Sequence, residues 1–134
     1  MSTAEQHARL RQLPHGLAGA PPLYATEDVP LVDKIIHAHA FLGACDWWIA
    51  EFDGDDTLFG YADLGDPDNA EWGYVSLVEL SQIRGQVAVQ VLAARGPWSQ
   101  YQPKIVNGRP VRFQTVSVEW DQHWTPKPFG GIER

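Results

Sequence analysis

Two histidines and two carboxylates in the first half of the chain have the types and spacing of a transition-metal site. His37 and His39 are two residues apart, as are Glu51 and Asp53, so each pair projects from one face if its segment is a strand. Neutral imidazole and carboxylate oxygen are ligands of zinc, manganese and iron. If the two strands pair antiparallel, this set indicates a metal-dependent enzyme. The alternative is ordinary cross-strand pairing on a half-exposed sheet.

Two further candidates for catalysis have less support from their neighbours. Glu119 and Asp121 alternate to one face, and with Glu51 or Asp53 they would form a carboxylate pair for acid–base chemistry. Cys45 is the single cysteine and lies in a turn with no base nearby in the sequence to activate it. Neither an HExxH motif nor a glycine-rich phosphate loop occurs. We therefore assign no catalytic residue from the sequence.

A basic and aromatic stretch in the second half has the composition that single-stranded nucleic acid favours. Residues 80–115 contain five Lys or Arg residues and no acidic residue. Stacking on aromatic rings combined with phosphate contacts is the usual chemistry of such binding. The candidate residues are Arg95, Trp98, Tyr101, Lys104, Arg109 and Arg112. The alternative is a hairpin that packs its aromatic side chains on the sheet and turns its bases toward the acidic half.

The acidic half of the chain indicates a protein partner. From Glu27 to Glu79 there are thirteen acidic residues and one base, Lys34, so this stretch has a net charge of −12, which argues against nonspecific DNA binding. The adjacent Trp47 and Trp48 point to opposite faces of one strand, so one faces away from the core unless both faces are covered. An exposed tryptophan beside acidic residues is typical of a protein-binding hot spot. The predicted partner-binding set is Trp47, Trp72, Asp55, Asp56, Asp63, Asp66 and Asp68.

Strands are the elements that must position most of these side chains. Alternation over residues 34–42 predicts a strand with one apolar face, and residues 47–53 predict a second strand. The first face consists of Ile36, Ala38, Ala40 and Leu42, and the second of Trp48, Ala50 and Phe52. Further strands are predicted over residues 58–62, 72–75, 86–93 and 109–120.

One helix is predicted among these strands. Ser76 followed by Glu79 forms a capping box, and apolar residues at helical spacing extend the helix over residues 77–84. The predicted fold class is therefore α+β, a mostly antiparallel, twisted sheet of five to seven strands with one short capped helix.

Length and composition fit one domain. The chain has 134 residues and is 44% hydrophobic. Prolines and glycines in residues 14–22 indicate a flexible N-terminal lead-in over residues 1–22, which leaves 23–134 as a single α+β domain. With no apolar run of about 18 residues and no apolar signal core, we expect no membrane partner and a cytoplasmic location. The single cysteine fits a reducing compartment, and no cofactor is expected apart from the metal alternative.

Four segments of the sequence together resemble one known family. They read PPLYATEDVPLVDKIIHAHAFL, WWIAEFD, LFGYA and EWGYVSLVELSQIRG, and they extend from Pro21 to Gly85. This set is similar to the DUF2958 family of small uncharacterised bacterial proteins. The segment VEWDQHWTPKP at 118–128 resembles the family's C-terminal segment, with Trp120 where arginine is usual. The resemblance leaves residues 86–114 as an insertion hairpin and implies an accessory protein of plasmids, phages and other mobile elements.

Taken together, these observations predict a non-enzymatic, acidic protein-interaction accessory module of mobile-element type. Such a module would modulate a host nucleoprotein or defence complex by presenting carboxylates in place of phosphates. Two alternatives stay open, a metal-dependent enzyme that uses the histidine and carboxylate face, and single-stranded nucleic-acid binding through the basic aromatic insertion.

Overall fold

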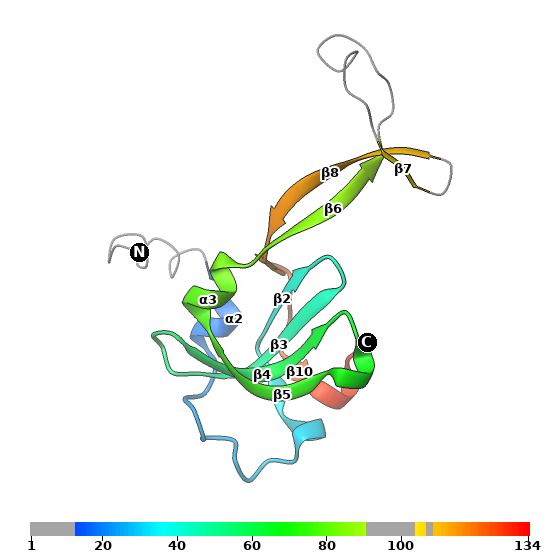
Figure 1. The fold of residues 1–134 in the computed structure, drawn as a ribbon. Coiled ribbons are helices and arrows are strands. Elements are labelled where there is room, and N and C mark those ends of the chain that lie inside the picture. Colours follow the sequence, from blue (N-terminus) through cyan, green and yellow to red (C-terminus); the bar gives the residue numbers. More distant parts are fainter. Residues whose placement is uncertain (1–12, 91–103, 107–108) are drawn as a thin grey trace.

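A five-stranded antiparallel sheet forms the body of the protein (Figure 1). The computed structural model describes residues 13–90, 104–106 and 109–134. The strand order is β5, β4, β3, β2, β9, and every neighbouring pair is antiparallel. The strands are β2 Ala38–Leu42, β3 Cys45–Phe52, β4 Thr57–Leu64, β5 Glu71–Ser76 and β9 Glu119–Trp120. The predicted α+β class with a mostly antiparallel sheet is confirmed.

Short helices flank the sheet. They are α2 His15–Ala18, α3 Leu77–Gln82 and the 3-10 helices η1 Leu31–Asp33, η2 Pro67–Asn69 and η4 Phe129–Gly131. The helix α3 is the predicted capped helix, because the Ser76 hydroxyl oxygen accepts a hydrogen bond from the Glu79 N–H at 3.2 Å. Among the described residues, no helix has the length and apolar character that crossing a membrane requires.

The N-terminal segment packs on the sheet before the predicted start of the domain. The sequence predicts a flexible lead-in over residues 1–22, yet α2 lies within this range and Leu17 is fully buried. Leu17 shares its core cluster with Leu77 and Leu80 of α3. Within the predicted lead-in, α2 is therefore packed on the core through Leu17, and the boundary at residue 23 stays a prediction.

Two smaller sheets complete the fold. The strands β1 Ile35–Ile36 and β10 Lys127–Pro128 pair with each other, and Ile36 packs in the cluster of Trp48. The strands β6 Arg84–Gln90, β8 Arg109–Ser117 and β7 Lys104–Val106 form a sheet in the order β6, β8, β7. Figure 1 shows this sheet projecting away from the body. The described residues of the predicted insertion over residues 86–114 lie in its strands, and the boundaries of the insertion stay a prediction.

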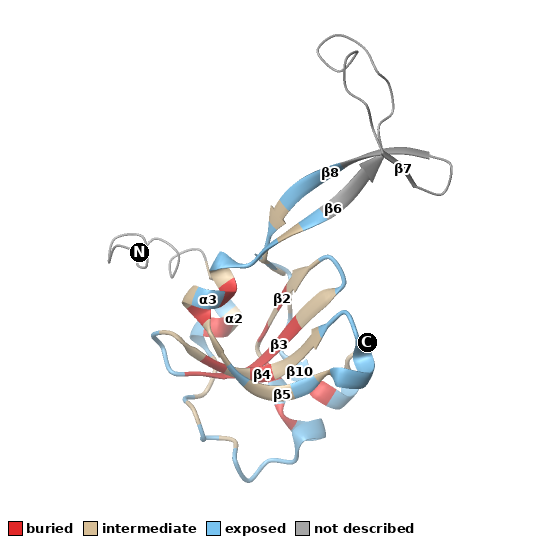
Figure 2. Cartoon of the chain, in the orientation of Figure 1, coloured by how far each residue is buried: buried red, intermediate tan, exposed pale blue. Residues whose placement is uncertain are grey.

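Apolar side chains cover both faces of the five-stranded sheet. Figure 2 shows where the buried residues lie along the chain. On one face Trp47 lies in a cluster with side chains of α2 and α3. On the other face Trp48 lies in a cluster with Ile36 and Phe129, and with Trp124 packed against it. Trp47 is 4% exposed and Trp48 is 5% exposed, so neither tryptophan of the adjacent pair faces solvent.

A β-bulge in β3 changes the predicted side-chain alternation. The sequence predicts Trp48, Ala50 and Phe52 on one face, but Phe52 belongs to the cluster of Trp47 and Ile49. The register between β3 and β4 shifts between Ile49 and Glu51, so one residue of β3 has no partner opposite it. Because side chains alternate with a period of two, the extra residue exchanges the faces of the residues that follow.

A break at His37 separates Ile36 from the rest of its predicted face. Ile36 pairs with β10 and lies in the cluster of Trp48, whereas Ala38 and Ala40 lie in the cluster of Trp47. The strand is interrupted between β1 and β2, where the His37 N–H donates to the Ile49 carbonyl at 2.8 Å. The predicted strand over residues 34–42 is therefore two strands with different partners.

Gly60 of β4 lets the backbones of β3 and β4 approach closely, and a substitution at this position tests that contact. A Cβ at Gly60 would lie 2.2 Å from the Trp48 carbonyl oxygen, and no side-chain rotation can relieve a clash with backbone. We expect Gly60→Ala to lower the free energy of unfolding by about 3 kcal/mol. At its cross-strand partner Gly73 an added Cβ meets nothing within 4 Å, so Gly73→Ala is expected to change stability by less than about 1 kcal/mol. Equal urea midpoints for the two variants would contradict the close approach.

Candidate functional site

A pocket lies at one end of the sheet, between the strands and the segment of residues 24–34. Glu51 of β3, Phe59 of β4 and Tyr74 of β5 are cross-strand partners and form a row beneath it. The cavity volume is about 380 Å³, which lies within the usual range of ligand pockets. We call it the Tyr24 pocket, and its lining residues are Tyr24, Glu27, Val29, Pro30, Leu31, Lys34, Glu51, Phe59 and Tyr74.

Glu51 places a buried negative charge at the Tyr24 pocket. Its side chain is 2% exposed, and its carboxylate accepts hydrogen bonds from the N–H of Tyr24 at 2.8 Å, the N–H of Thr26 at 3.1 Å and the Thr26 hydroxyl. Burial alone raises the pKa of Glu51, but these hydrogen bonds and the charge of Lys34 lower it, and the net pKa lies below its ordinary value of 4.5. Glu51 is therefore ionised at neutral pH.

Lys34 supplies the countercharge. The residue is 4% exposed, and its ammonium donates hydrogen bonds to the Thr26 carbonyl and, at 3.0 Å, to Thr26 Oγ1. The Lys34 Nζ also lies 5.9 Å from the centroid of the Phe59 ring. Since the Thr26 hydroxyl accepts from Lys34 and donates to Glu51, it links the two charges. The link through Thr26 reduces the free-energy cost of burying both charges.

Tyr24 is held in a strained backbone conformation at the mouth of the pocket. Its φ is 69°, and it alone among the described non-glycine residues has a positive φ. The conformation costs about 1–2 kcal/mol, and it presents the Tyr24 N–H to Glu51. The ring remains 60% exposed, 6.1 Å from that of Tyr74, which is itself 5.0 Å from that of Phe59. A strained residue with an exposed aromatic side chain is a candidate for a functional position.

Two carboxylates, of Glu27 and Glu51, and one ammonium, of Lys34, line the pocket, so its lining has a net charge of −1. The pKa of Tyr74 is raised by partial burial first, then by the neighbouring Tyr24 hydroxyl and by the charges of Glu51 and Glu27. Acidic neighbours raise the pKa of a phenol because they disfavour a second negative charge. The mouth therefore combines two aromatic rings with a small excess of negative charge.

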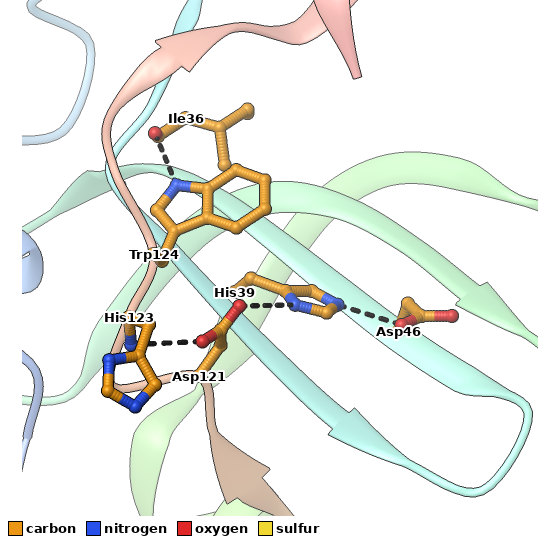
Figure 3. A network of polar contacts seen from close by, with 6 residues as sticks. All are labelled: Ile36, His39, Asp46, Asp121, His123 and Trp124. Atoms are coloured by element: carbon orange, nitrogen blue, oxygen red, sulfur yellow. Dashed lines mark hydrogen bonds and ion pairs between the residues drawn. The ribbon is translucent and has the colours of Figure 1, made fainter. Parts of the chain in front are cut away.

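A second polar cluster surrounds His39 (Figure 3). His39 Nε2 lies 2.7 Å from Asp46 Oδ1, and Nδ1 lies 3.9 Å from Asp121 Oδ2. The imidazole stacks on the Trp48 ring at 5.4 Å, and the Trp124 indole N–H donates to the Ile36 carbonyl at 2.9 Å. These contacts join the β2–β3 hairpin to the segment that follows β9. We infer that the cluster holds the C-terminal segment against the sheet.

The four residues predicted to bind a metal do not converge. In the ladder of β2 and β3, His39 is opposite Trp48 and not opposite Glu51. The register of this hairpin and the strand break at His37 therefore keep both histidines from pairing with Glu51. Glu51 faces the Tyr24 pocket, and the Asp53 carboxylate accepts from the N–H groups of residues 55, 56 and 57. Within the described ranges, no three His, Cys, Asp or Glu side chains are grouped as a metal site.

The weaker catalytic candidates also lie apart from the pocket. Burial, followed by the charges of Asp46 and Asp63, raises the pKa of Cys45 and so keeps its thiol protonated. Asp121 belongs to the His39 cluster and accepts from the His123 N–H at 3.0 Å. Glu119 is exposed on β9. The expected carboxylate pair of the β9 region with Glu51 or Asp53 is therefore not formed.

The predicted partner-binding set divides into buried, capping and exposed residues. Trp47 is buried, so it cannot be the exposed contact that the sequence predicts. Trp72 is half-buried and stacks on Phe59 with ring centroids 5.6 Å apart. The carboxylates of Asp56, Asp63 and Asp66 accept backbone N–H groups of Val78, Gly65 and Asp68, whereas Asp55 and Asp68 are exposed. Part of the acidity therefore caps turns and α3 rather than facing a partner.

The predicted nucleic-acid set is only partly within the described residues. Arg95, Trp98 and Tyr101 lie outside them, Lys104 is in β7, and Arg109 and Arg112 are in β8. This function stays a prediction.

Sequence reasoning missed Tyr24, Thr26 and Lys34 as members of a site. A usable signal was nevertheless present. Lys34 is the single base in an acidic stretch, and Glu51 interrupts an otherwise apolar run of β3. Charged residues are almost never fully buried unless they are paired. A lone base in an acidic stretch and a carboxylate in an apolar run are therefore candidates to pair with each other.

Replacing Glu51 tests the buried charge network. Glu51→Gln leaves the Lys34 ammonium buried without its countercharge, and we expect the free energy of unfolding to fall by about 3 kcal/mol. Glu119→Gln changes an exposed carboxylate of β9 and is expected to change stability by less than about 0.5 kcal/mol. Urea unfolding followed by tryptophan fluorescence measures both. Similar midpoints would show that the network does not stabilise the fold.

Acid is expected to remove the contribution of Glu51. A carboxylate whose pKa is lower in the folded than in the unfolded state stabilises the fold above the unfolded pKa, and this is lost as pH falls through the folded pKa. The difference in unfolding free energy between the wild type and Glu51→Gln should be constant near neutral pH and shrink below pH 4.5. Urea titrations at pH values from about 7 to about 3 measure it. A difference that is independent of pH would contradict the assignment.

Comparison with known proteins places the chain in a family. No curated protein and no solved structure matches it. The family described as "Protein of unknown function (DUF2958)" matches residues 3–97, a range that includes α2, β2 to β5, α3 and every residue of the Tyr24 pocket. The match extends beyond the resemblance over residues 21–85, and it enters the segment 86–114. Since it covers more than half of the chain, the protein belongs to the DUF2958 family.

Proposed function

We propose that the protein is a non-enzymatic, acidic protein-interaction module, and that its partner binds at the mouth of the Tyr24 pocket. The observation that carries the proposal is the strained, exposed Tyr24, which the buried Glu51 holds in place. A backbone conformation that costs free energy and presents an aromatic ring to solvent is better explained by a contact with a partner than by stability.

Exposed apolar side chains around the pocket support a binding surface there. Tyr24, Leu31, Val32 and Tyr74 are 60%, 49%, 55% and 54% exposed. Three of them, Tyr24, Leu31 and Tyr74, line the pocket, and Val32 is the neighbour of Leu31 on η1. The rings of the two tyrosines lie 6.1 Å apart. Exposed apolar side chains that gather at one place, rimmed by polar residues, are typical of protein-interaction sites.

Charge supports a basic partner. Glu27 lines the pocket, Asp28 and Asp33 lie in the same exposed segment, and the stretch from Glu27 to Glu79 carries thirteen acids and one base. A basic surface is what nucleic-acid-binding proteins use to contact phosphates. We therefore propose a host nucleoprotein or defence complex as the partner. Carboxylates of this chain would occupy the places of nucleic-acid phosphates on that partner. Such a role fits the proposal that the protein is a mobile-element accessory protein.

The chemistry of the pocket favours binding over catalysis. The Glu51 carboxylate is satisfied by three donors, and its pKa is below the ordinary value, so it is a weak proton acceptor at neutral pH. Lys34 is held by Thr26, and its positive charge contributes to lowering the pKa of Glu51. Both groups position the 24–34 segment instead of reacting with a substrate.

Site-specific crosslinking tests the proposed surface. A photo-crosslinking phenylalanine analogue replaces Tyr74 at the pocket mouth or, in a matched control, Leu64, which is 66% exposed in β4. In a bacterial lysate we expect basic proteins to crosslink at position 74 and not at position 64. Unlabelled wild type should compete for these crosslinks, and unlabelled Tyr24→Asn should compete at least ten-fold less well. Asparagine tolerates the left-handed conformation, so this variant should still fold.

Two results would contradict the proposal. The first is the same crosslinked proteins at both positions, because the contacts would then not depend on the pocket. The second is equal competition by the wild type and Tyr24→Asn, because the strained tyrosine would then have no role in binding.

A further inference from the structure

The strand β5 forms an open edge of the sheet directly beside the Tyr24 pocket. It pairs with β4 on one side, and no described strand pairs with its other side. The described residues also form backbone-to-backbone hydrogen bonds outside helices and strands, and none of these involves a residue of β5. The outward N–H and C=O groups of β5 are therefore available to an added strand.

This edge lacks the features by which edge strands usually prevent pairing with another chain. The sequence of β5, EWGYVS, contains neither proline nor lysine, and its register with β4 is continuous over all six residues. Proline, lysine and bulges are the common protection of a sheet edge. A Cβ at Gly73, in the middle of the strand, would meet nothing within 4 Å, so the edge is also sterically open there.

Tyr74 connects the edge to the pocket. It is a residue of β5, it is 54% exposed, and its ring forms a wall of the Tyr24 pocket beside Tyr24 and Phe59. A strand paired with β5 would place alternate side chains on the pocket face of the sheet. One of them would therefore reach the rings at the pocket mouth.

The charges around the edge favour a basic strand, because three exposed carboxylates outnumber the Lys34 ammonium that also lines the pocket. Glu71 is exposed on β5 itself, Glu79 is exposed on α3 immediately after it, and Glu27 lines the pocket. Arginine suits such a place better than lysine, because its planar guanidinium stacks on aromatic rings and pairs with carboxylates.

We infer that the partner adds an extended, arginine-containing segment to β5 as a sixth strand of the sheet and inserts one arginine side chain into the Tyr24 pocket. This inference rests on the proposed function and specifies its mode. Backbone hydrogen bonds to β5 supply affinity, and the arginine in contact with Glu27 and the aromatic rings supplies specificity.

The test uses the full chain and a fluorescent six-residue peptide that alternates Thr and Arg, the length of β5. Fluorescence anisotropy at low ionic strength should detect binding of this peptide. Affinity should fall at least ten-fold when Glu replaces the arginines of the peptide, and also with the Tyr24→Asn protein. It should be unchanged with Leu64→Ala.

Methylated peptides distinguish strand addition from pocket binding alone. One peptide is N-methylated at all Thr amides and another at all Arg amides. Because alternate N–H groups of an extended chain point to opposite edges, only one of the two peptides should lose binding. Amide hydrogen exchange of β5 should slow when the unmethylated peptide binds.

The outcomes separate the inference from the proposed function. Equal binding of the two methylated peptides overturns strand addition. Absence of binding by the unmethylated peptide also overturns it. In either case, position-specific crosslinking at the pocket mouth would leave the proposed function standing. If both the peptide and the crosslinking fail, the proposed function falls with the inference.

Discussion

The buried carboxylate of Glu51 is the constraint on which the rest of the pocket depends. An ionised group that is 2% exposed must be surrounded by hydrogen-bond donors and a countercharge. The donors come from Tyr24 and Thr26 and the countercharge from Lys34. All three residues lie in the segment of residues 24–34. The same requirement fixes the strained turn at Tyr24. One charge in β3 thus determines the course of a segment 17 to 27 residues away in sequence, since Lys34 and Tyr24 precede position 51 by these distances.

Coverage of both sheet faces explains why tryptophan is so frequent in this chain. With helices on one face and the C-terminal segment on the other, Trp47 and Trp48 are both buried although their side chains point in opposite directions. The His39 cluster belongs to this second layer, because Asp121 and Trp124 hold the C-terminal segment against β2 and β1. Several acidic residues of the loops, among them Asp55 and Asp68, remain exposed.

Sequence patterns predicted the fold class, the capped helix and the central hairpin, because these depend on local signals such as the Ser76 to Glu79 spacing and the alternation in β2 and β3. The family was also recognisable from its motifs. The face assignments failed at Phe52 and Ile36, because a bulge or a strand break of one residue exchanges faces without leaving a mark in composition. The site was missed because it depends on the pairing of Glu51 with Lys34 through Thr26, a contact that periodicity does not encode.

The projecting sheet of β6, β8 and β7 meets the body at a narrow neck. Arg84 at the start of β6 is paired with Ser117 at the end of β8, so the chain leaves and re-enters the body at neighbouring points. Closing a longer loop between two fixed points costs only about 0.6 kcal/mol for each doubling of its length. The stability of the body therefore depends little on the length of chain between Arg84 and Ser117. Lengthening or shortening the chain between Arg84 and Ser117 should therefore leave the sheet and its pocket able to fold.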